Sequence, residues 1–232
     1  MSTDEAAAEV PVATGTRREL ALARALDQAR SRAENRVQLF LDAARELIDE
    51  NAREFTVQEV VERSGQSLRT FYQYFAGKHE LLLALFEESI EATAIHLEEV
   101  VDACDAPRER LHQFALEYFR MCRPTPKGEP ATGPTPATME FAQQLLTSHP
   151  KEAARAFAPL VVMLEQLLAD AAASGDLRPG LDHRRIAGVA LQAIMFNAFA
   201  ATISGSLPAD GDTAPETLWT LLMHGIGVRE SI

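Results

Sequence analysis

Two short segments near residue 60 place apolar side chains at the spacing of amphipathic helices. Thr56 precedes the first segment and Glu59 follows three residues later, so T-V-Q-E forms a capping box. Gly65 supplies the left-handed backbone that a tight turn requires, and Ser67 can cap a second helix directly afterwards. The pattern predicts a helix-turn-helix unit, in which the second helix enters the major groove of DNA.

The second of these helices is expected to present an apolar face to the core and a polar face to DNA. Its apolar positions recur at three- and four-residue spacing, at Leu68, Phe71 and Phe75. The residues that then point outward are Arg69, Thr70, Gln73 and Tyr74. Arg pairs with guanine, Gln with adenine, and the Thr methyl packs on the thymine methyl. Tyr72 at the edge and Lys78 before the next helix suit phosphate contacts. A generic helical hairpin with a solvated polar face is the alternative.

Beyond residue 77 the chain continues as helices. Residues 78–104 carry one apolar face and end before Pro107, which gives a rod of about 40 Å. Residues 123–138 contain five Pro and two Gly, so they are expected to form a loop. Further helices are expected over 108–122, 138–148, 151–173, 182–204 and 214–228, the last with a capping box, T-A-P-E, at 213–216. No useful β-type alternation occurs, so the fold class is all-α.

The N-terminal arm divides into two parts. Residues 1–15 are small, polar and acidic, so they are expected to be disordered, and they lack the apolar core of a signal peptide. From Thr16, T-R-R-E forms another capping box, and helical spacing follows over 17–31. This extension either runs into the first helix or lies along the DNA. An arm partly disordered without DNA is the alternative.

The motif S-L-R-T-F-Y-Q-Y-F-A-G-K-H-E-L, starting at Ser67, resembles the recognition-helix signature of the tetracycline-repressor (TetR) family of bacterial regulators. D-A-A-R-E-L at 42–47 resembles the end of that family's first helix, and Asn51 stands where a Gly usually ends it. The detailed resemblance covers about residues 36–86, and over 87–232 only the general architecture is similar. The sequence departs from the family in placing Leu68 and Arg69 where Lys and Gly are common.

The resemblance implies an all-α homodimer. We expect an N-terminal arm (1–30), a three-helix helix-turn-helix DNA-binding domain (31–77) and a larger helical-bundle domain for ligand binding and dimerisation (78–232). The family pattern implies phosphate contacts by Thr56, Ser67, Tyr72 and Lys78 and base contacts by Arg69, Thr70 and Tyr74; Leu68 and Gln73 complete the expected DNA-binding set. It further implies a bacterial cytoplasmic repressor that binds a palindromic double-stranded operator, is nucleoid-associated when bound, and is released by a small molecule.

The resemblance also implies an effector pocket in the C-terminal half. The aromatic, Met and aliphatic side chains expected to line it are Phe86, Ile90, Phe114, Tyr118, Met121, Phe141, Met163, Met195 and Phe196. Deformable Met and rigid aromatic residues suit an adaptable apolar cavity, although they suit an ordinary core equally well. A hydrophobic or amphipathic effector is therefore expected. The alternative is a constitutive DNA-binding protein whose C-terminal half only dimerises.

Residues 186–209 contain no charge and are long enough to span a membrane. Gln192 and Asn197 interrupt this segment and Gly205 and Pro208 break it, so we interpret it as a buried helix rather than a span. Small residues along it predict close approach of a second helix across a two-fold axis. The dimer interface expected from this segment and the last helix comprises Ala187, Ala190, Ile194, Ala198, Ala201, Leu218 and Leu222.

Charge and reactive residues limit the remaining possibilities. The net charge of −12 opposes DNA binding unless it is unevenly spread, and residues 17–36 indeed hold six Arg against three acids. A local basic face suffices, because screening acts within about 10 Å. The two Cys form no metal-ligand or disulfide pattern, and the six His include no HExxH. No Gly-rich phosphate loop is present either, so we expect no enzyme, metal or cofactor.

Overall fold

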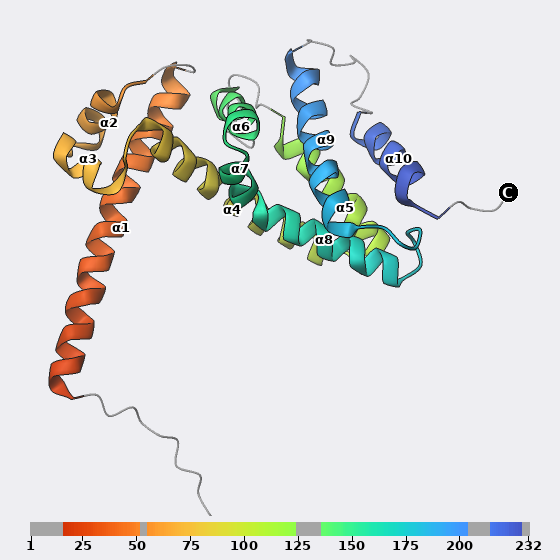
Figure 1. Cartoon of the computed structure of the whole chain (residues 1–232), viewed down its shortest axis with the longest axis horizontal. Coiled ribbons are helices and arrows are strands. Elements are labelled where there is room, and N and C mark those ends of the chain that lie inside the picture. The colour runs from red at the N-terminus through yellow and green to blue at the C-terminus, as the bar shows by residue number, and fades with distance from the viewer. Residues whose placement is uncertain (1–15, 52–54, 124–135, 204–213, 229–232) are drawn as a thin grey trace, which may run out of the picture.

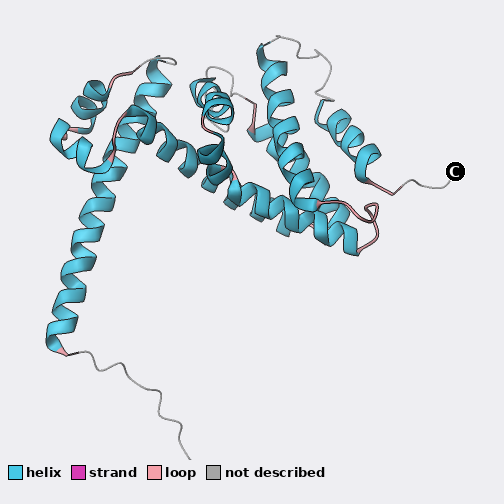
Figure 2. Ribbon diagram, viewed as in Figure 1, coloured by secondary structure: helices cyan, strands magenta, loops and turns pink. Residues whose placement is uncertain are grey.

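The computed structural model describes residues 16–51, 55–123, 136–203 and 214–228, and these ranges are almost entirely helical (Figures 1 and 2). The helices are α1 (Arg17–Asn51), α2 (Val57–Ser64), α3 (Leu68–Tyr74), α4 (Lys78–Asp102), α5 (Pro107–Met121), α6 (Pro136–Ser148), α7 (Pro150–Ala156), α8 (Ala158–Ala173), α9 (His183–Ile203) and α10 (Ala214–Ile226). The all-α fold class is therefore confirmed. Within the described ranges the one β-type pairing is a single antiparallel bridge between Leu177 and Gly227, which ties the end of α10 to the α8–α9 loop.

The helical part of the arm runs into the first helix of the domain, because α1 continues without a break from Arg17 to Asn51. Its start is capped as T-R-R-E predicts: the Thr16 amide donates to Glu19 Oε2 at 2.7 Å, and the Glu19 amide donates to the Thr16 hydroxyl at 3.4 Å. The expected domain boundary at residue 30 falls within this helix. Its N-terminal half projects past α2 and α3 without a neighbouring helix (Figure 1).

The core of the N-terminal domain forms where α1, α2, α3 and the start of α4 meet. Phe40 is fully buried and makes edge-on contacts with Phe71 and Phe75, with ring centroids 5.4 and 6.2 Å apart. Val60 of α2 and Leu81 of α4 close the same cluster. Because Leu81 lies one turn into α4, the long helix is part of this core from its first turn onward.

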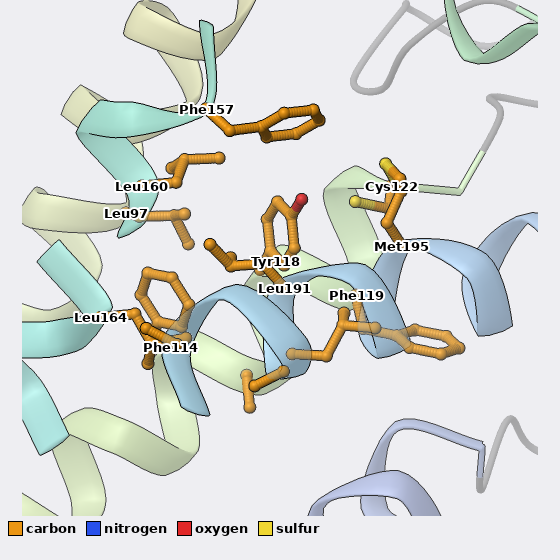
Figure 3. Close-up of a cluster of buried hydrophobic side chains, with 14 of the residues drawn as sticks. Leu97, Phe114, Tyr118, Phe119, Cys122, Phe157, Leu160, Leu164, Leu191 and Met195 are labelled. Carbon is orange, nitrogen blue, oxygen red and sulfur yellow. The ribbon is translucent and has the colours of Figure 1, made fainter. Parts of the chain in front are cut away.

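The second and larger core is built from α4 to α10. Side chains from α4, α5, α8 and α9 gather in it, among them Leu97, Phe114, Leu160 and Leu191 (Figure 3). Helix α4 therefore contributes to both cores, with Leu81 in the first and residues from Phe86 onward in the second. It is the rod that connects the two domains (Figure 1).

Residues 151–173 do not form the single helix that the sequence predicts. Helix α7 ends at Ala156, and α8 begins at Ala158 with its axis bent by 60°. The cause is Pro159, which has no amide to donate to the carbonyl of Arg155 and whose ring clashes with that carbonyl. The prediction was wrong because the apolar spacing continues through the break.

Two expected features lie partly outside the described residues. They are residues 124–135 of the Pro-rich loop and Thr213, the first residue of the expected capping box at 213–216. Pro107, expected as a stop, is instead the first residue of α5, a position where its missing amide costs no helical hydrogen bond.

In the described part of the chain no single helix is long and apolar enough to cross a membrane; α7 and α8 meet that test only as a bent pair.

Candidate nucleic-acid interface and ligand pocket

The α2–turn–α3 unit is fixed by local hydrogen bonds of the kind that its sequence predicts. The Glu59 amide donates to the Thr56 hydroxyl at 3.2 Å, and the Thr56 amide donates to Glu59 Oε2 at 2.7 Å. Gly65 has a φ of 65°, and its amide bonds back to the end of α2. The Thr70 amide donates to the Ser67 hydroxyl at 3.0 Å, which caps α3. These contacts set the angle between the two helices.

Packing of Phe71 and Phe75 on Phe40 determines which face of α3 is free. Arg69, Tyr72 and Gln73 lie on the exposed side, and Tyr72 is 57% exposed. No ion pair or hydrogen bond to a described residue engages the Arg69 guanidinium. α3 therefore presents a free cation, an amide and a phenol together on one exposed helical face.

Three residues of α3 are placed differently from the sequence-based expectation. Leu68 is 43% exposed, so it is not an inward anchor as its spacing predicted. Tyr74, expected to face bases, is half-buried against the N-terminal core. The Thr70 hydroxyl is half-buried and lies 2.8 Å from the Ser67 hydroxyl. Because α3 has only seven residues, its start lies at the edge of the core rather than over it.

Lys78, expected to contact a phosphate, has a partner inside the protein. Its ammonium donates to the Phe55 carbonyl at 2.6 Å and lies 4.2 Å from the centre of the Phe55 ring. Hydrogen bonds from the backbone and hydroxyl of Thr56, followed by the charge of Lys78, lower the pKa of Glu59. Lys78 thus ties the entrance of α2 to the start of α4.

Ion pairs connect α1 to α2 and α1 to α4 in the N-terminal domain. Arg63 of α2 bonds to Glu46 and Glu50 of α1, and Arg45 of α1 bonds to Glu88 of α4. On the exposed N-terminal half of α1, Arg30 pairs with Glu34, whereas the other Arg side chains in 17–36 make no ion pair with described residues.

The larger domain contains a cavity of about 360 Å³ at the bend between α7 and α8. Its wall is mainly apolar and comes from α6, α7, α8 and α9. Arg184 and Gln192 of α9 are its main polar side chains, and Arg184 also lies 3.6 Å from Glu165. The other lining residues are Leu146, Pro150, Ala153, Ala154, Phe157, Ala158, Val161, Gly188, Leu191 and Met195. An apolar wall with a cation at its rim can hold an amphipathic anion.

Of the nine residues expected to line a pocket, only Met195 lines this cavity. Phe114 lines a second cavity of about 20 Å³, enough for little more than a water molecule. Phe86, Ile90, Tyr118 and Phe141 fill the core, Met121 and Met163 pack half-buried against it, and Phe196 is 47% exposed. The lining residues that the sequence analysis did not predict include those around the break between α7 and α8. Pro159 is the sequence signal that could have located this break.

The expected dimer residues on α9 conflict with the structure. Ala187, Ala190, Ile194 and Ala198 are all buried within the single chain, where α9 packs against α8 and α5. Leu218 of α10 is also buried, Leu222 is half-buried against α5, and the side chain of Ala201 lies outside the description. Small residues on an apolar helix indicate close packing but not its partner. Among the side chains that the structure describes on these two helices, the large apolar ones that are exposed are Val189, Phe196 and Leu221.

The chain is similar to known proteins in sequence over its N-terminal domain and in fold over most of its length. Residues 40–85 match the family model described as bacterial regulatory proteins, tetR family. Over these residues the chain is similar to TetR-family regulators. The match spans the helix-turn-helix unit, the part of α1 that supports it and the first turns of α4, so the N-terminal domain is similar to the part of these regulators that the family model describes. No curated protein matches the chain significantly in sequence.

Solved structures of other regulators share the fold over most of their length. A transcriptional regulator FadR from Bacillus subtilis, in complex with stearoyl-CoA, has 20% identity and a TM-score of 0.60, covering 82% of this chain and 98% of that one. RolR in complex with resorcinol has 19% identity and a TM-score of 0.64, covering 86% and 91%. A TetR-family regulator from Pectobacterium atrosepticum has 17% identity and a TM-score of 0.65, covering 87% and 99%. At these identities the likeness shows the fold alone.

Proposed function

We propose that this chain is a repressor of the TetR type that binds a palindromic operator as a homodimer and is released by a small amphipathic molecule. It acts by binding alone, without catalysis, in the bacterial cytoplasm. The observation that carries the proposal is that α4 belongs to both cores and is contacted by a residue of the cavity wall. The state of the cavity then determines the position of the DNA-binding domain.

The exposed face of α3 reads the operator in this proposal. Arg69 and Gln73 carry donors that match guanine and adenine in the major groove. Tyr72, the capped start of α2 at Thr56, and Ser67 contact phosphates. Lys78 has two roles, because only one of its three ammonium donors is used by Phe55 and its positive charge stays close to the start of α2.

The cavity at the α7–α8 bend is the effector site. Its apolar wall accommodates a hydrocarbon or aromatic body, and Arg184 at the rim pairs with a carboxylate or phosphate. Two regulators of similar fold have been solved with stearoyl-CoA and with resorcinol. The first of these ligands is a large amphipathic anion, which supports the same class of molecule for this chain.

The coupling route runs through two aromatic rings. Phe157 lines the cavity and makes an edge-on contact with Phe86 of α4, with ring centroids 5.3 Å apart. A ligand that displaces Phe157 pushes on Phe86 and tilts α4. The first turn of α4 holds Leu81 in the helix-turn-helix core and Lys78 on Phe55, so the tilt reorients α3.

Dimerisation uses the exposed faces of α9 and α10. Val189 and Phe196 lie seven residues apart on one face of α9, and Leu221 of α10 is 68% exposed. Burying them against a second copy across a two-fold axis removes apolar surface from water. Two linked copies then place two α3 helices for half-sites about 34–36 Å apart.

The alternative is a constitutive DNA-binding protein, and a ligand screen separates the two. Saturated fatty acids, their coenzyme A esters, phenols and alkyl amines of matched length are tested by thermal shift. An anionic amphiphile at a hundred times its Kd raises the Tm by about 5–10 °C, and amines of the same length do not. Arg184→Gln removes this preference, whereas Arg185→Gln, on the neighbouring exposed position, keeps it. No stabilisation by any compound would favour the constitutive protein.

A further inference from the structure

Three side chains with metal-binding chemistry meet at the junction between the two domains. His79 is the second residue of α4, His149 immediately precedes α7, and Glu152 is in the first turn of α7. One nitrogen of each imidazole and one oxygen of the carboxylate lie within 4.8 Å of one another. His79 is therefore brought to the other two across about 70 residues of chain by the packing of α4 against α7.

Close contacts within the cluster bring the three side chains together. His79 Nε2 lies 2.7 Å from Glu152 Oε2, and His149 Nδ1 lies 3.8 Å from the same oxygen. The two imidazole rings are 4.5 Å apart, and the His79 ring also packs on Phe141 of α6. The hydrogen bond from His79 lowers the pKa of Glu152.

We propose that His79, His149 and Glu152 form a binding site for a divalent transition-metal ion of the zinc class. Two imidazoles and one carboxylate, with water as the fourth ligand, are a donor set that zinc accepts in an open tetrahedral site. Imidazole nitrogen selects against Mg²⁺ and Ca²⁺, which prefer oxygen ligands.

The geometry is close to that of a bound site. Zinc–ligand distances of about 2.0–2.2 Å place the ligand atoms of a tetrahedron roughly 3.4 Å apart. The His79–Glu152 pair at 2.7 Å must open, and the widest spacing between ligand atoms, at most 4.8 Å, must close by up to about 1.4 Å. All three side chains are partly exposed, between 36% and 43%, so rotations about their own bonds supply this movement.

An ion at this place links the parts of the molecule that the proposed function requires to move. It joins the first turn of α4, next to Lys78, to α7, where Pro150 and Ala153 line the cavity. Occupancy stiffens the junction and restricts the tilt of α4. This regulatory consequence rests on the proposed function, whereas binding of the ion does not.

Metal binding is measured first on untagged, metal-free protein without DNA. Zn²⁺ is titrated in competition with a chromophoric chelator, and Co²⁺ is used as a spectroscopic probe of coordination. The wild-type chain binds one ion, and Co²⁺ gives the intense visible bands of a four-coordinate site. His79→Gln, His149→Gln and Glu152→Gln each weaken binding by at least about tenfold, since even the loss of a partner behind a ligand costs 10–100-fold.

Controls separate the cluster from other donors. His224→Gln changes an exposed histidine at the end of α10 and leaves the affinity unchanged. Cys104→Ser and Cys122→Ser also leave the affinity for the ion unchanged, which excludes thiolates as the ligands. Far-ultraviolet circular dichroism verifies that each variant is folded. Absence of binding at micromolar Zn²⁺, or equal affinity in wild type and in the triple variant of the cluster, would overturn the site.

The regulatory step is tested separately with operator DNA. Zn²⁺ changes operator affinity of the wild type and has no effect on the triple variant. If the protein binds Zn²⁺ through these residues but no DNA, the proposed function fails and the metal site stands. If DNA binding is intact and Zn²⁺ is not bound, only the metal site fails.

Discussion

Phe157 and Phe86 make an edge-on ring contact, with centroids 5.3 Å apart and planes at 72°, and this contact joins the cavity to the helix that carries the DNA-binding domain. Phe141 also makes an edge-on contact with Phe86, with centroids 6.1 Å apart, but does not line the cavity. The two rings therefore provide a matched pair for testing transmission.

Phe157→Leu should uncouple effector from operator. The substitution keeps an apolar side chain, so its cost in stability is about 1.5 kcal/mol or less. Without the ring, ligand binding no longer pushes on α4, and the ligand-induced loss of operator affinity falls several-fold. Phe141→Leu should keep the response. Operator affinity is measured by fluorescence anisotropy at zero and saturating ligand, and an equal response in both variants would contradict the route.

Arg69→Ala should lower operator affinity selectively. Loss of a bidentate contact to guanine costs about 1–3 kcal/mol on the operator and relaxes the preference at one position per half-site. On a scrambled duplex the loss is small. Arg108→Ala, at an exposed position on α5, serves as the control and changes neither affinity. Equal losses on both duplexes would show that Arg69 contacts only the DNA backbone.

Lys78→Ala should act on stability and on DNA binding at once. Removing a charged hydrogen bond to Phe55 O destabilises the N-terminal domain by about 1.5–3 kcal/mol. Affinity falls by a similar factor on operator and scrambled DNA, and the slope of log affinity against log salt decreases by roughly one unit. Thermal melts and salt titrations measure the two effects. An unchanged slope would leave Lys78 as an internal anchor without a phosphate contact.

Phe196→Glu should convert dimers to monomers. Glutamate at a position buried between two copies leaves a charge without a partner in an apolar interface. Operator affinity then drops, because one half-site alone is bound. Val162→Glu is the matched control, since Val162 is 56% exposed on α8, which is not one of the two helices of the proposed interface. Sedimentation velocity reports the oligomeric state, and a persistent Phe196→Glu dimer would place the interface elsewhere.

Local signals explain why the helix-turn-helix was predictable from sequence. The caps at Thr56 and Ser67 and the turn at Gly65 act within four residues, so their hydrogen bonds can be foreseen from spacing alone. The contact of Lys78 with Phe55 could not be foreseen, because it depends on how α4 returns to the start of α2. In the sequence, a lysine beside a helix N-terminus looks the same whether it contacts a DNA phosphate or a carbonyl inside the protein.

The regulatory half was harder to predict for a related reason. Helix α9 is apolar on nearly every side, so periodicity does not distinguish the face that packs on α8 from the face left for a partner. Ala198 was assigned to the outside and is fully buried, whereas Phe196 was assigned to a pocket and is exposed. Aromatic and Met residues likewise mark apolar surroundings, but they do not distinguish a filled core from a cavity.

The central claim is that one equilibrium, transmitted by α4, links the cavity to the operator, and reciprocity tests it most directly. The Kd of the tightest anionic amphiphile from the thermal-shift panel is measured with and without saturating operator DNA. The account predicts that DNA weakens ligand binding by the same factor, roughly 5–150-fold, by which ligand weakens DNA binding. A ligand affinity that operator DNA leaves unchanged would contradict it.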